Sequence, residues 1–295
     1  MLHFRILILL LFIFLTASCS DETKPISGYF TTLSYNVAGL PEGISSSHPA
    51  LYTSLISPLL NEFDVVHVQE DFCYHDSLLL YNTHPYVTQP MPCVPNGDGL
   101  NTFSDFPIQN LIRQAWVDCF GPDCLTPKGF SYSQIEILNG AFIDFYNVHC
   151  DAGSTDEDFE ARRSNIRQLC NYIQVHSQGQ AVVVMGDFNS RYTREADTIR
   201  AFEALGFTDV WVQLVRNDSI PAYGESLKDC QPLESGYNCE GIDKIFYRSS
   251  SQIELLPVEF RRGDDNRFTL NGIDSLPLSD HLPLFCRFHF NIYNQ

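Results

Sequence analysis

Short apolar runs, each closed by a polar or turn residue, recur along most of this chain and restrict it to a fold built on β-sheets. The runs are rich in β-branched and aromatic residues, as strands are. Strands are predicted at residues 29–36, 64–70, 130–138, 141–149, 181–187, 241–247 and 281–288. Two of these runs meet at Asn139-Gly140, a residue pair typical of a tight hairpin turn.

Helical patterns lie between some of the strands. Helices are expected at residues 49–63, 156–177 and 193–205. The second pattern is the clearest, because its apolar residues form one stripe and its arginines, Arg162, Arg163 and Arg167, lie largely off that stripe. Many strands, few helices and long loops indicate stacked sheets flanked by helices, in one α/β domain over residues 28–295.

The first 19 residues have the pattern of a secretory signal. Ile6 to Leu15 is an uninterrupted apolar run that is too short to span a bilayer stably, and small residues follow it. We therefore expect residues 1–19 to be removed and the protein to be secreted. One alternative is a membrane anchor. Another is a lipoprotein with its lipid on Cys19, which Thr16 disfavours because it stands where an aliphatic residue is preferred.

The ten cysteines of the chain suit an oxidising compartment. Disulfides are expected for Cys119–Cys124, which flank a Gly-Pro turn, for Cys230–Cys239, which flank a polar loop, and for Cys73–Cys93. Free thiols in apolar surroundings are expected at Cys150, Cys170 and Cys286. A zinc site is the rival interpretation of CFGPDC, but no second close pair of Cys or His accompanies that segment.

The chain is strongly acidic, with 18 Lys and Arg against 36 Asp and Glu and a formal net charge of −18 at pH 7. Such a surface repels phosphate backbones at long range, which argues against a high-affinity nucleic-acid binder. It does not exclude an enzyme that handles a phosphodiester through a bound cation, because the cation reverses the local sign of the charge.

Polar side chains gather at the ends of the predicted strands. They are Asn36, Glu70, His149, Asp151, Asp187, Asn189, Asp243, Asp280 and His281. Singly, each suits a strand end or a turn. If the strand ends meet at one edge of a sheet, carboxylates, amides and imidazoles come together, and such a cluster is costly unless a cation neutralises it. Oxygen ligands with few thiolates suit Mg²⁺ or Ca²⁺ better than zinc.

A series of motifs resembles the exonuclease–endonuclease–phosphatase superfamily. The matching segments, in chain order, are SYNVAGL, VQE, NVHCDAG, MGDFN, GIDKI and LSDHLPL, and they span nearly all of the chain after the signal. The resemblance implies a four-layer α/β/β/α sandwich of two mostly antiparallel sheets flanked by helices. It also implies metal-dependent hydrolysis of a phosphoester.

The resemblance implies which residues hold the metal ion. The ion would be Mg²⁺, with Mn²⁺ or Ca²⁺ as substitutes, and its residues would be Glu70, with Asn36 beside it, and Asp280. The ion would polarise a phosphoryl oxygen and stabilise the leaving alkoxide.

The resemblance also implies catalytic roles. His281 would be the general base, and Asp243 would orient its imidazole. His149 would donate to the phosphoryl oxygens as negative charge builds. Asp187 and Asn189, two residues apart, would both face the phosphate and the attacking water.

A longer match indicates which branch of the superfamily the chain resembles. CFGPDCLTPKGFSYSQIEI, residues 119–137, is similar to a segment of secreted bacterial sphingomyelinases, and residues 96–108 resemble the strand before it. The resemblance implies a phosphodiesterase that acts on a phospholipid headgroup, with peripheral membrane contact, and we expect a monomer. Two features depart from that family. Its hairpin of exposed aromatics corresponds to residues 261–278, which offer only Phe268, and Tyr74 stands where it places an Asn of a second metal site.

Other functions fit the same centre. A secreted deoxyribonuclease-like nuclease would use it, although the acidic charge disfavours nucleic acid as a partner. An inositol-phosphate phosphatase should have a basic pocket, which the sequence does not reveal. A binding protein without catalysis is the alternative from a different class, but every expected catalytic position is intact.

Overall fold

The computed structural model describes residues 24–230, 239–263, 266–270 and 276–293. The expected signal at residues 1–19, including Cys19, lies outside the described residues. So does part of the segment that corresponds to the aromatic hairpin, at residues 264–265 and 271–275.

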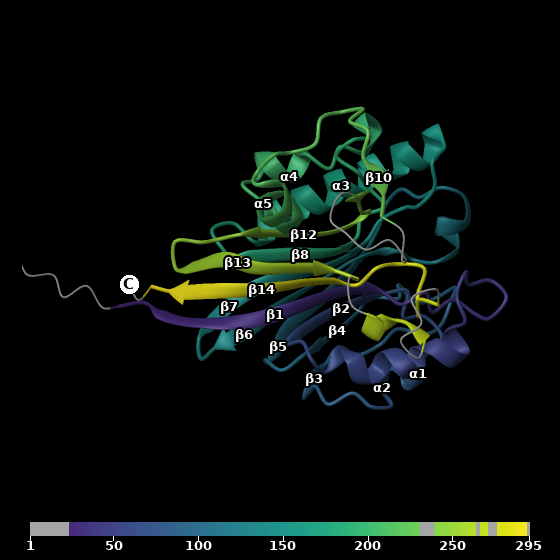
Figure 1. Ribbon diagram of the computed structural model, residues 1–295, viewed down its shortest axis with the longest axis horizontal. Coiled ribbons are helices and arrows are strands. Elements are labelled where there is room, and N and C mark those ends of the chain that lie inside the picture. Colours follow the sequence, from purple (N-terminus) through teal and green to yellow (C-terminus); the bar gives the residue numbers. More distant parts are fainter. Residues whose placement is uncertain (1–23, 231–238, 264–265, 271–275, 294–295) are drawn as a thin grey trace, which may run out of the picture.

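Two six-stranded sheets stack face to face (Figure 1). The first has the order β13-β14-β1-β2-β4-β3, formed by β1 (Ile26–Asn36), β2 (Val65–Gln69), β3 (Tyr86–Val87), β4 (Asn101–Ser104), β13 (Ile253–Arg262) and β14 (Leu284–Ile292). The second has the order β5-β6-β7-β8-β12-β9, formed by β5 (Ile108–Ala115), β6 (Gly129–Leu138), β7 (Ala141–His149), β8 (Val182–Asp187), β9 (Thr208–Asp209) and β12 (Asp243–Arg248). A short separate pair consists of β10 (Lys228–Asp229) and β11 (Cys239–Glu240).

Helices cover the outer face of each sheet (Figure 1). The first sheet carries α1 (Pro49–Leu60) and α2 (His75–Leu79), and the second carries α3 (Asp156–His176), α4 (Ala201–Ala204) and α5 (Val210–Arg216). Short 3₁₀ turns are η1 (Gly121–Leu125), η2 (Glu195–Asp197) and η3 (Asn266–Phe268). The predicted α/β/β/α sandwich is confirmed. Across the described ranges, no helix combines the length and the apolar character needed to cross a bilayer.

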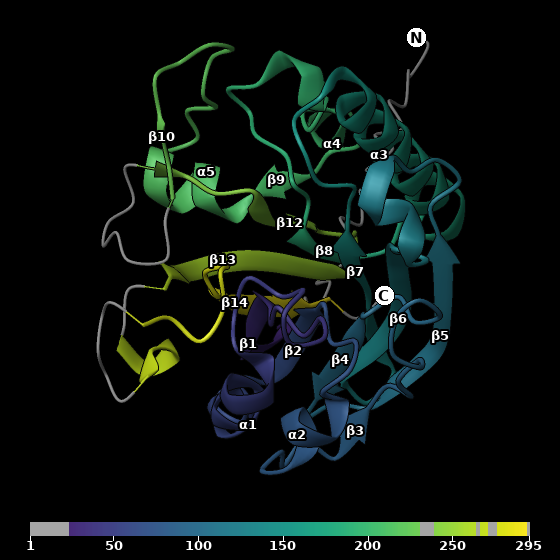
Figure 2. The same cartoon turned by 90° about the vertical axis from the view of Figure 1, so that its right-hand side faces the viewer.

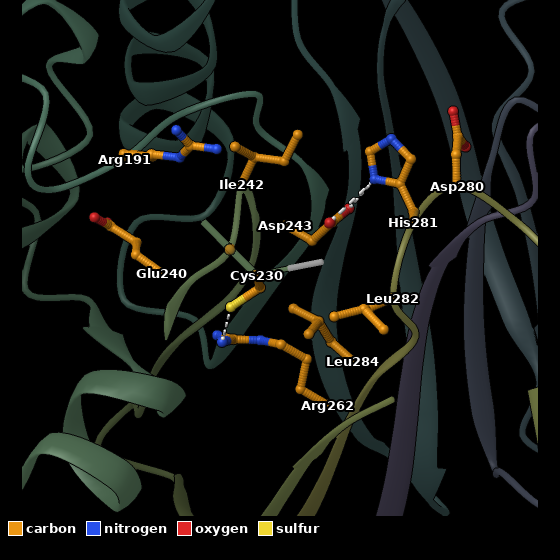
Figure 3. Close-up of a pocket in the computed structure, with 11 residues that line it drawn as sticks. Arg191, Cys230, Glu240, Ile242, Asp243, Arg262, Asp280, His281, Leu282 and Leu284 are labelled. Atoms are coloured by element: carbon orange, nitrogen blue, oxygen red, sulfur yellow. Dashed lines mark hydrogen bonds and ion pairs between the residues drawn. The ribbon is translucent and has the colours of Figure 1, made fainter. Parts of the chain in front are cut away.

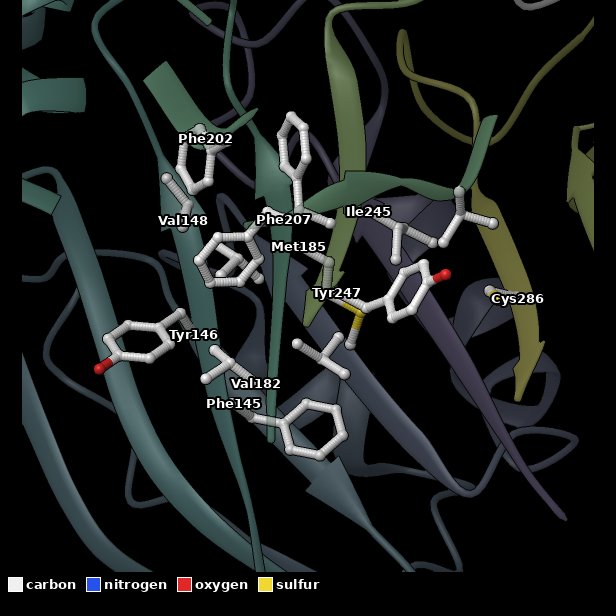
Figure 4. Close-up of a cluster of buried hydrophobic side chains, with 14 of the residues drawn as sticks. Phe145, Tyr146, Val148, Val182, Met185, Phe202, Phe207, Ile245, Tyr247 and Cys286 are labelled. Atoms are coloured by element: carbon white, nitrogen blue, oxygen red, sulfur yellow. The ribbon is translucent and has the colours of Figure 1, made fainter. Parts of the chain in front are cut away.

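Two buried clusters hold the layers together. The larger includes Phe145, Met185 and Cys286 and joins the two sheets to each other and to α3, α4 and α5 (Figure 4). The smaller packs the first sheet against α1 and α2, for example through Ile56 and Val68. Each fully buried side chain of this size contributes about 1.5–3 kcal/mol, so the sheets are held in a fixed relation.

One parallel pair of strands lies in the middle of each sheet, and all other neighbours are antiparallel. In the pair β1–β2, Asn36 lies opposite Gln69, and in the pair β7–β8, His149 lies opposite Asp187. Because the carboxyl ends of parallel strands meet at the same edge of a sheet, the predicted site residues come together there. Figure 2 looks along the strands at this end of the molecule.

Most of the predicted elements are present, with one correction. The hairpin closes where expected, with Leu138 opposite Ala141. The predicted helix over residues 193–205 is wrong in its extent, because only η2 and α4 form there. The chain breaks between them at Thr198, whose φ of 51° lies in the left-handed region.

The cysteine predictions are confirmed. Disulfides join Cys73–Cys93, Cys119–Cys124 and Cys230–Cys239. The free thiols of Cys150, Cys170 and Cys286 are buried.

Candidate active site

Asn36 and Glu70 lie at the ends of the parallel pair β1–β2. Glu70 follows β2 directly, and its left-handed φ of 56° turns the chain sharply there. The side-chain amide of Asn36 donates to Glu70 Oε1 at 3.0 Å and to Asp187 Oδ2 at 3.2 Å, while its Oδ1 accepts from the backbone N–H of Ala38 at 3.0 Å. Asn36 therefore holds two carboxylates from different sheets in place.

Asp187 is the centre of the cluster. In the second sheet it lies opposite His149 on one side and opposite Asp243 on the other. His149 Nε2 lies 3.6 Å from Asp187 Oδ2 and 3.8 Å from Glu70 Oε1. Burial raises the pKa of Asp187 to about 6, an effect that the charge of His281 opposes and that of Asp243 reinforces.

His281, in the loop before β14, bridges the two carboxylates that the β8–β12 pairing puts side by side. Its Nδ1 lies 3.1 Å from Asp243 Oδ2 (Figure 3), and its Nε2 lies 3.6 Å from Asp187 Oδ2. Burial alone would lower the pKa of His281, but the carboxylates of Asp243, Asp187 and Asp280 together raise it well above its usual value. The imidazolium therefore offsets a like-charge pair that would otherwise destabilise the sheet.

His149 has the opposite character. Burial, together with the positive charges of Lys128 and His281, lowers the pKa of His149 well below its usual value. Its ring is therefore neutral and can donate one hydrogen bond. Nδ1 is buried without a hydrogen-bond partner in the described part of the chain, and Nε2 faces the space beside Glu70 and Asp187.

Asn189 and Asp280 lie at the border of the cluster. Asn189 has a left-handed φ of 50°, its backbone N–H donates to Asp187 Oδ1 at 2.9 Å, and its side chain donates to the carbonyl of Cys150 at 3.2 Å. The hydroxyl of Ser46 donates to the carboxylate of Asp280. The structure thus brings together Asn36, Glu70, His149, Asp187, Asp243 and His281, and sets Asn189 and Asp280 beside them. Their individual roles stay predictions.

The cluster contains donors for a metal ion. One ligand atom each from Asp187, Asp243 and His281 lies within 4.8 Å of the others. Glu70, the predicted metal residue, has 18% of its side chain exposed, so its carboxylate is open to an ion from solvent. Carboxylate oxygens without a thiolate are the ligand set of a hard cation.

Lys128 is a charged residue near the cluster that the sequence reasoning passed over. Only 10% of its side chain is exposed, and its amino group pairs with Asp123. Its positive charge acts on the pKa values of both His149 and Asp187. The available signal was its position within residues 119–137, the segment that resembles the sphingomyelinases.

Comparison with known proteins assigns the family. The model of the Endonuclease/Exonuclease/phosphatase family 2 matches residues 45–236. The chain belongs to this family. Sphingomyelinases from Mycobacterium bovis and Mycobacterium tuberculosis are 40% identical to this family member over an alignment of 281 positions, which covers 92% of this chain and 55% of theirs. The chain therefore spans about half the length of the curated relatives it matches.

Solved structures share the fold of this family member. Sphingomyelinase C from Streptomyces griseocarneus has a TM-score of 0.61 at 16% identity, over 88% of this chain and 99% of the other. A beta toxin variant from Staphylococcus aureus with bound magnesium ions has a TM-score of 0.62 at 18% identity, over 90% and 99%. At these identities the likeness establishes the fold alone.

Proposed function

We propose that this family member is a divalent-metal-dependent phosphodiesterase of the sphingomyelinase type, which releases the headgroup of a phospholipid by attack of water on phosphorus. The observation that carries the chemistry is the pair His281–Asp243, 3.1 Å apart, facing Asp187. The substrate class rests on the 40% identity with mycobacterial sphingomyelinases over 92% of this chain.

His281 is the base of the proposed reaction. Hydrogen bonding of Nδ1–H to Asp243 leaves Nε2 as the atom that takes the proton of the attacking water, once a bound cation offsets the carboxylate charges that otherwise keep the imidazole protonated. In this reaction the water and the phosphate lie beside Asp187, whose Oδ2 is 3.6 Å from Nε2 of His281. Asn189 lies next to them, and its backbone N–H donates to Asp187 Oδ1. In-line attack then requires the scissile ester to point away from His281.

His149 stabilises the charge that develops on phosphorus. Its ring is neutral, so Nε2–H donates to a phosphoryl oxygen without the large desolvation that a buried cation would need. Asn36 keeps Glu70 and Asp187 at their positions while this charge builds.

The donors present fit Mg²⁺, with Mn²⁺ or Ca²⁺ as substitutes. Glu70 would hold the ion, Asn36 would fix the carboxylate, and Asp280 would support the water network. The bound ion would offset the carboxylate charge and stabilise the negative charge of the phosphoryl group and of the leaving oxygen.

The first test is hydrolysis of sphingomyelin vesicles and of plasmid DNA in parallel by the purified protein, with Mg²⁺ and with chelator. We expect phosphocholine release that needs Mg²⁺, is lost in His281→Ala, and leaves DNA intact. Cut DNA with intact lipid would instead assign the centre to a nuclease. Inactivity on both would direct the search to soluble phosphoesters.

We further propose that the protein is exported. The apolar N-terminal run and the three disulfides support export, since disulfides persist outside the reducing cytosol. Fractionation of expressing cells should recover the protein from the medium, shortened by the signal. Retention with membranes that is abolished by Cys19→Ala would indicate the lipoprotein alternative, and a full-length reduced protein in the cytosol would contradict export.

A further inference from the structure

An apolar pocket of about 460 Å³ opens beside Glu70. Its walls include Leu40, Ile44, Phe72, Val94, Pro122 and Leu125. Its charged lining consists of Glu70 and the Asp123–Lys128 pair. The pocket and the candidate active site therefore share Glu70, the residue predicted to hold the metal ion.

We propose that this pocket receives the hydrocarbon chain of a single lipid substrate, next to its scissile phosphate, and so selects lipid over soluble phosphodiesters. The inference rests on the proposed function and names the part of the substrate that the catalytic residues do not contact. A volume of this size with mostly apolar walls and few charges is typical of a small-molecule site.

The layout of the pocket favours a lipid over a protein partner. In a lipid phosphodiester the phosphate and the hydrocarbon lie only a few bonds apart. The pocket has the same layout, because Glu70 belongs both to the apolar lining and to the catalytic cluster. Lys128, whose positive charge reaches His149 and Asp187, suits an anionic phosphate at this junction.

The rim of the pocket is apolar and open to solvent. Ile44, from the loop after β1, is 70% exposed, and Leu125, from η1, is 69% exposed. A single exposed apolar side chain is ordinary on a protein surface, but these two border the same apolar pocket. Hydrocarbon in the pocket would cover both.

The segments that form the walls are braced before any ligand binds. The backbone N–H of Gly39 donates to the carbonyl of Glu70 at 3.0 Å, and the backbone N–H of Glu42 donates to the hydroxyl of Tyr74 at 3.1 Å. Val94 and Leu125 each directly follow a disulfide-bonded cysteine, Cys93 of the pair Cys73–Cys93 and Cys124 of the pair Cys119–Cys124. Because the walls are already ordered, a ligand binds without the free-energy cost of ordering them.

The pocket offers this protein a contact with lipid that the segment corresponding to the aromatic hairpin, residues 261–278, does not supply. Phe268, the one aromatic residue in the corresponding segment, is only 7% exposed and packs against Tyr35 with ring centroids 5.2 Å apart. It is committed to the smaller core cluster.

The test measures binding as a function of chain length. Hexyl-, octyl-, decyl- and dodecylphosphocholine, each below its critical micelle concentration, are titrated calorimetrically into the full chain with His281→Ala and Mg²⁺, so that turnover does not interfere. We expect the dissociation constant to fall roughly threefold to fourfold for each added methylene that enters the pocket.

The same series is then measured with Ile44→Ser, with Leu125→Ser and with the matched control Val175→Ser. Val175 is 74% exposed on α3 and lines no part of the pocket. The two pocket variants should reduce the affinity gained from hexyl to dodecyl at least about tenfold, and the control should keep it. Equal chain-length dependence in pocket variants and control, or none in any protein, would overturn the inference.

Phosphocholine release from sphingomyelin vesicles by the wild-type protein judges the proposed function separately. Absence of release together with chain-length-dependent binding would refute the enzyme assignment and leave the hydrocarbon site. Phosphocholine release without chain-length-dependent binding would support the enzyme assignment and refute the hydrocarbon site.

Discussion

Glu70 and His281 are both linked to Asp187, Glu70 through Asn36 and His281 directly, but their surroundings differ. Glu70 is partly exposed and accepts from Asn36, whereas His281 is held by Asp243. The metal ion therefore has two candidate positions. One is at Glu70, as the motifs imply, and the other is among the closely spaced donors of Asp187, Asp243 and His281. In the second case His281 would not be free to act as a base.

Two substitutions distinguish these positions. Asp243→Asn should lower kcat about 10²- to 10⁴-fold, because the imidazole of His281 loses the carboxylate that orients it, and should leave the Mg²⁺ concentration for half-maximal activity unchanged. Glu70→Gln should raise that concentration at least about tenfold. Both quantities come from phosphocholine release against Mg²⁺ concentration. The reverse outcome would place the ion between Asp243 and His281.

At the scale of elements, the pairing of β7 with β8 sets the distance between His149 and Asp187. Gly186 lies in β8 at a φ of 157°, and a Cβ there would lie 2.0 Å from the carbonyl oxygen of Val148 in β7. The two strands could accommodate a side chain at this position only by separating.

Gly186→Ala should therefore lower the free energy of unfolding by about 3 kcal/mol or more and reduce kcat even where the variant is folded. Urea unfolding and phosphocholine release measure the two effects. Gly140→Ala is the matched control, since Gly140 also has a positive φ, 78°, but its Cβ would meet nothing within 4 Å. It should cost about 1 kcal/mol. Equal losses in the two variants would show that backbone strain, not collision with β7, is responsible.

The turn η1 is attached to the strand end of β7 through two carboxylates. Asp151 accepts from the backbone N–H of Phe120 at 3.0 Å, and Asp123 accepts from the backbone N–H of Ala152 at 2.6 Å. Burial, together with the negative charge of Asp123, raises the pKa of Asp151 to about 7. An Asp in an unfolded chain has a pKa of about 4, so the proton on Asp151 stabilises the fold fully below pH ~4. That stabilisation is lost as the pH rises to about 7.

Asp151→Asn keeps the acceptor for Phe120 and carries no charge. It should increase the free energy of unfolding by about 1–2 kcal/mol above pH ~7 and change it little at pH ~4. Urea unfolding of both proteins across this range measures the difference, which should grow as the pH rises. A difference that is the same at both ends would show that Asp151 does not titrate in this window.

The elements also show how far the sequence could predict the structure. Apolar runs rich in β-branched residues, together with the Asn-Gly turn, predicted the strands, and the motifs predicted the residues that meet at their ends. Arg162 was placed off the apolar stripe of α3 but is completely buried. Its guanidinium pairs with Asp197 at 3.0 Å and donates to the carbonyl of Asp151 at 2.8 Å. Helical periodicity in the sequence does not reveal which residues of other segments will pair with a helix. It also does not reveal a left-handed turn such as the one at Thr198, which depends on tertiary surroundings.

At the scale of the whole molecule, the disulfides Cys73–Cys93 and Cys119–Cys124 cross-link segments that lie largely outside the two sheets. Cys73 and Cys93 are 20 residues apart, and Cys119 and Cys124 are 5 apart. Because a cross-link restricts the unfolded chain more when its loop is longer, replacing the first pair by alanine should cost about 3 kcal/mol and the second about 2 kcal/mol. Urea unfolding of each alanine-substituted variant measures its cost, and urea unfolding of the wild type with and without reductant measures the disulfides together. A wild-type midpoint that reductant leaves unchanged would contradict this expectation.

The hydrogen bonds between the two sheets have a consequence for the order of events in folding. Asn36 of β1 contacts Asp187 of β8, 151 residues along the chain, and Gln69 of β2 donates to Asn147 of β7 at 2.7 Å. Contacts between such distant segments form late, after local structure. Neither sheet contains all of the predicted catalytic residues, so a chain with native secondary structure but undocked sheets should be inactive. On dilution from denaturant, far-ultraviolet circular dichroism should recover before phosphocholine release does, and the lag between them would time the docking of the two halves.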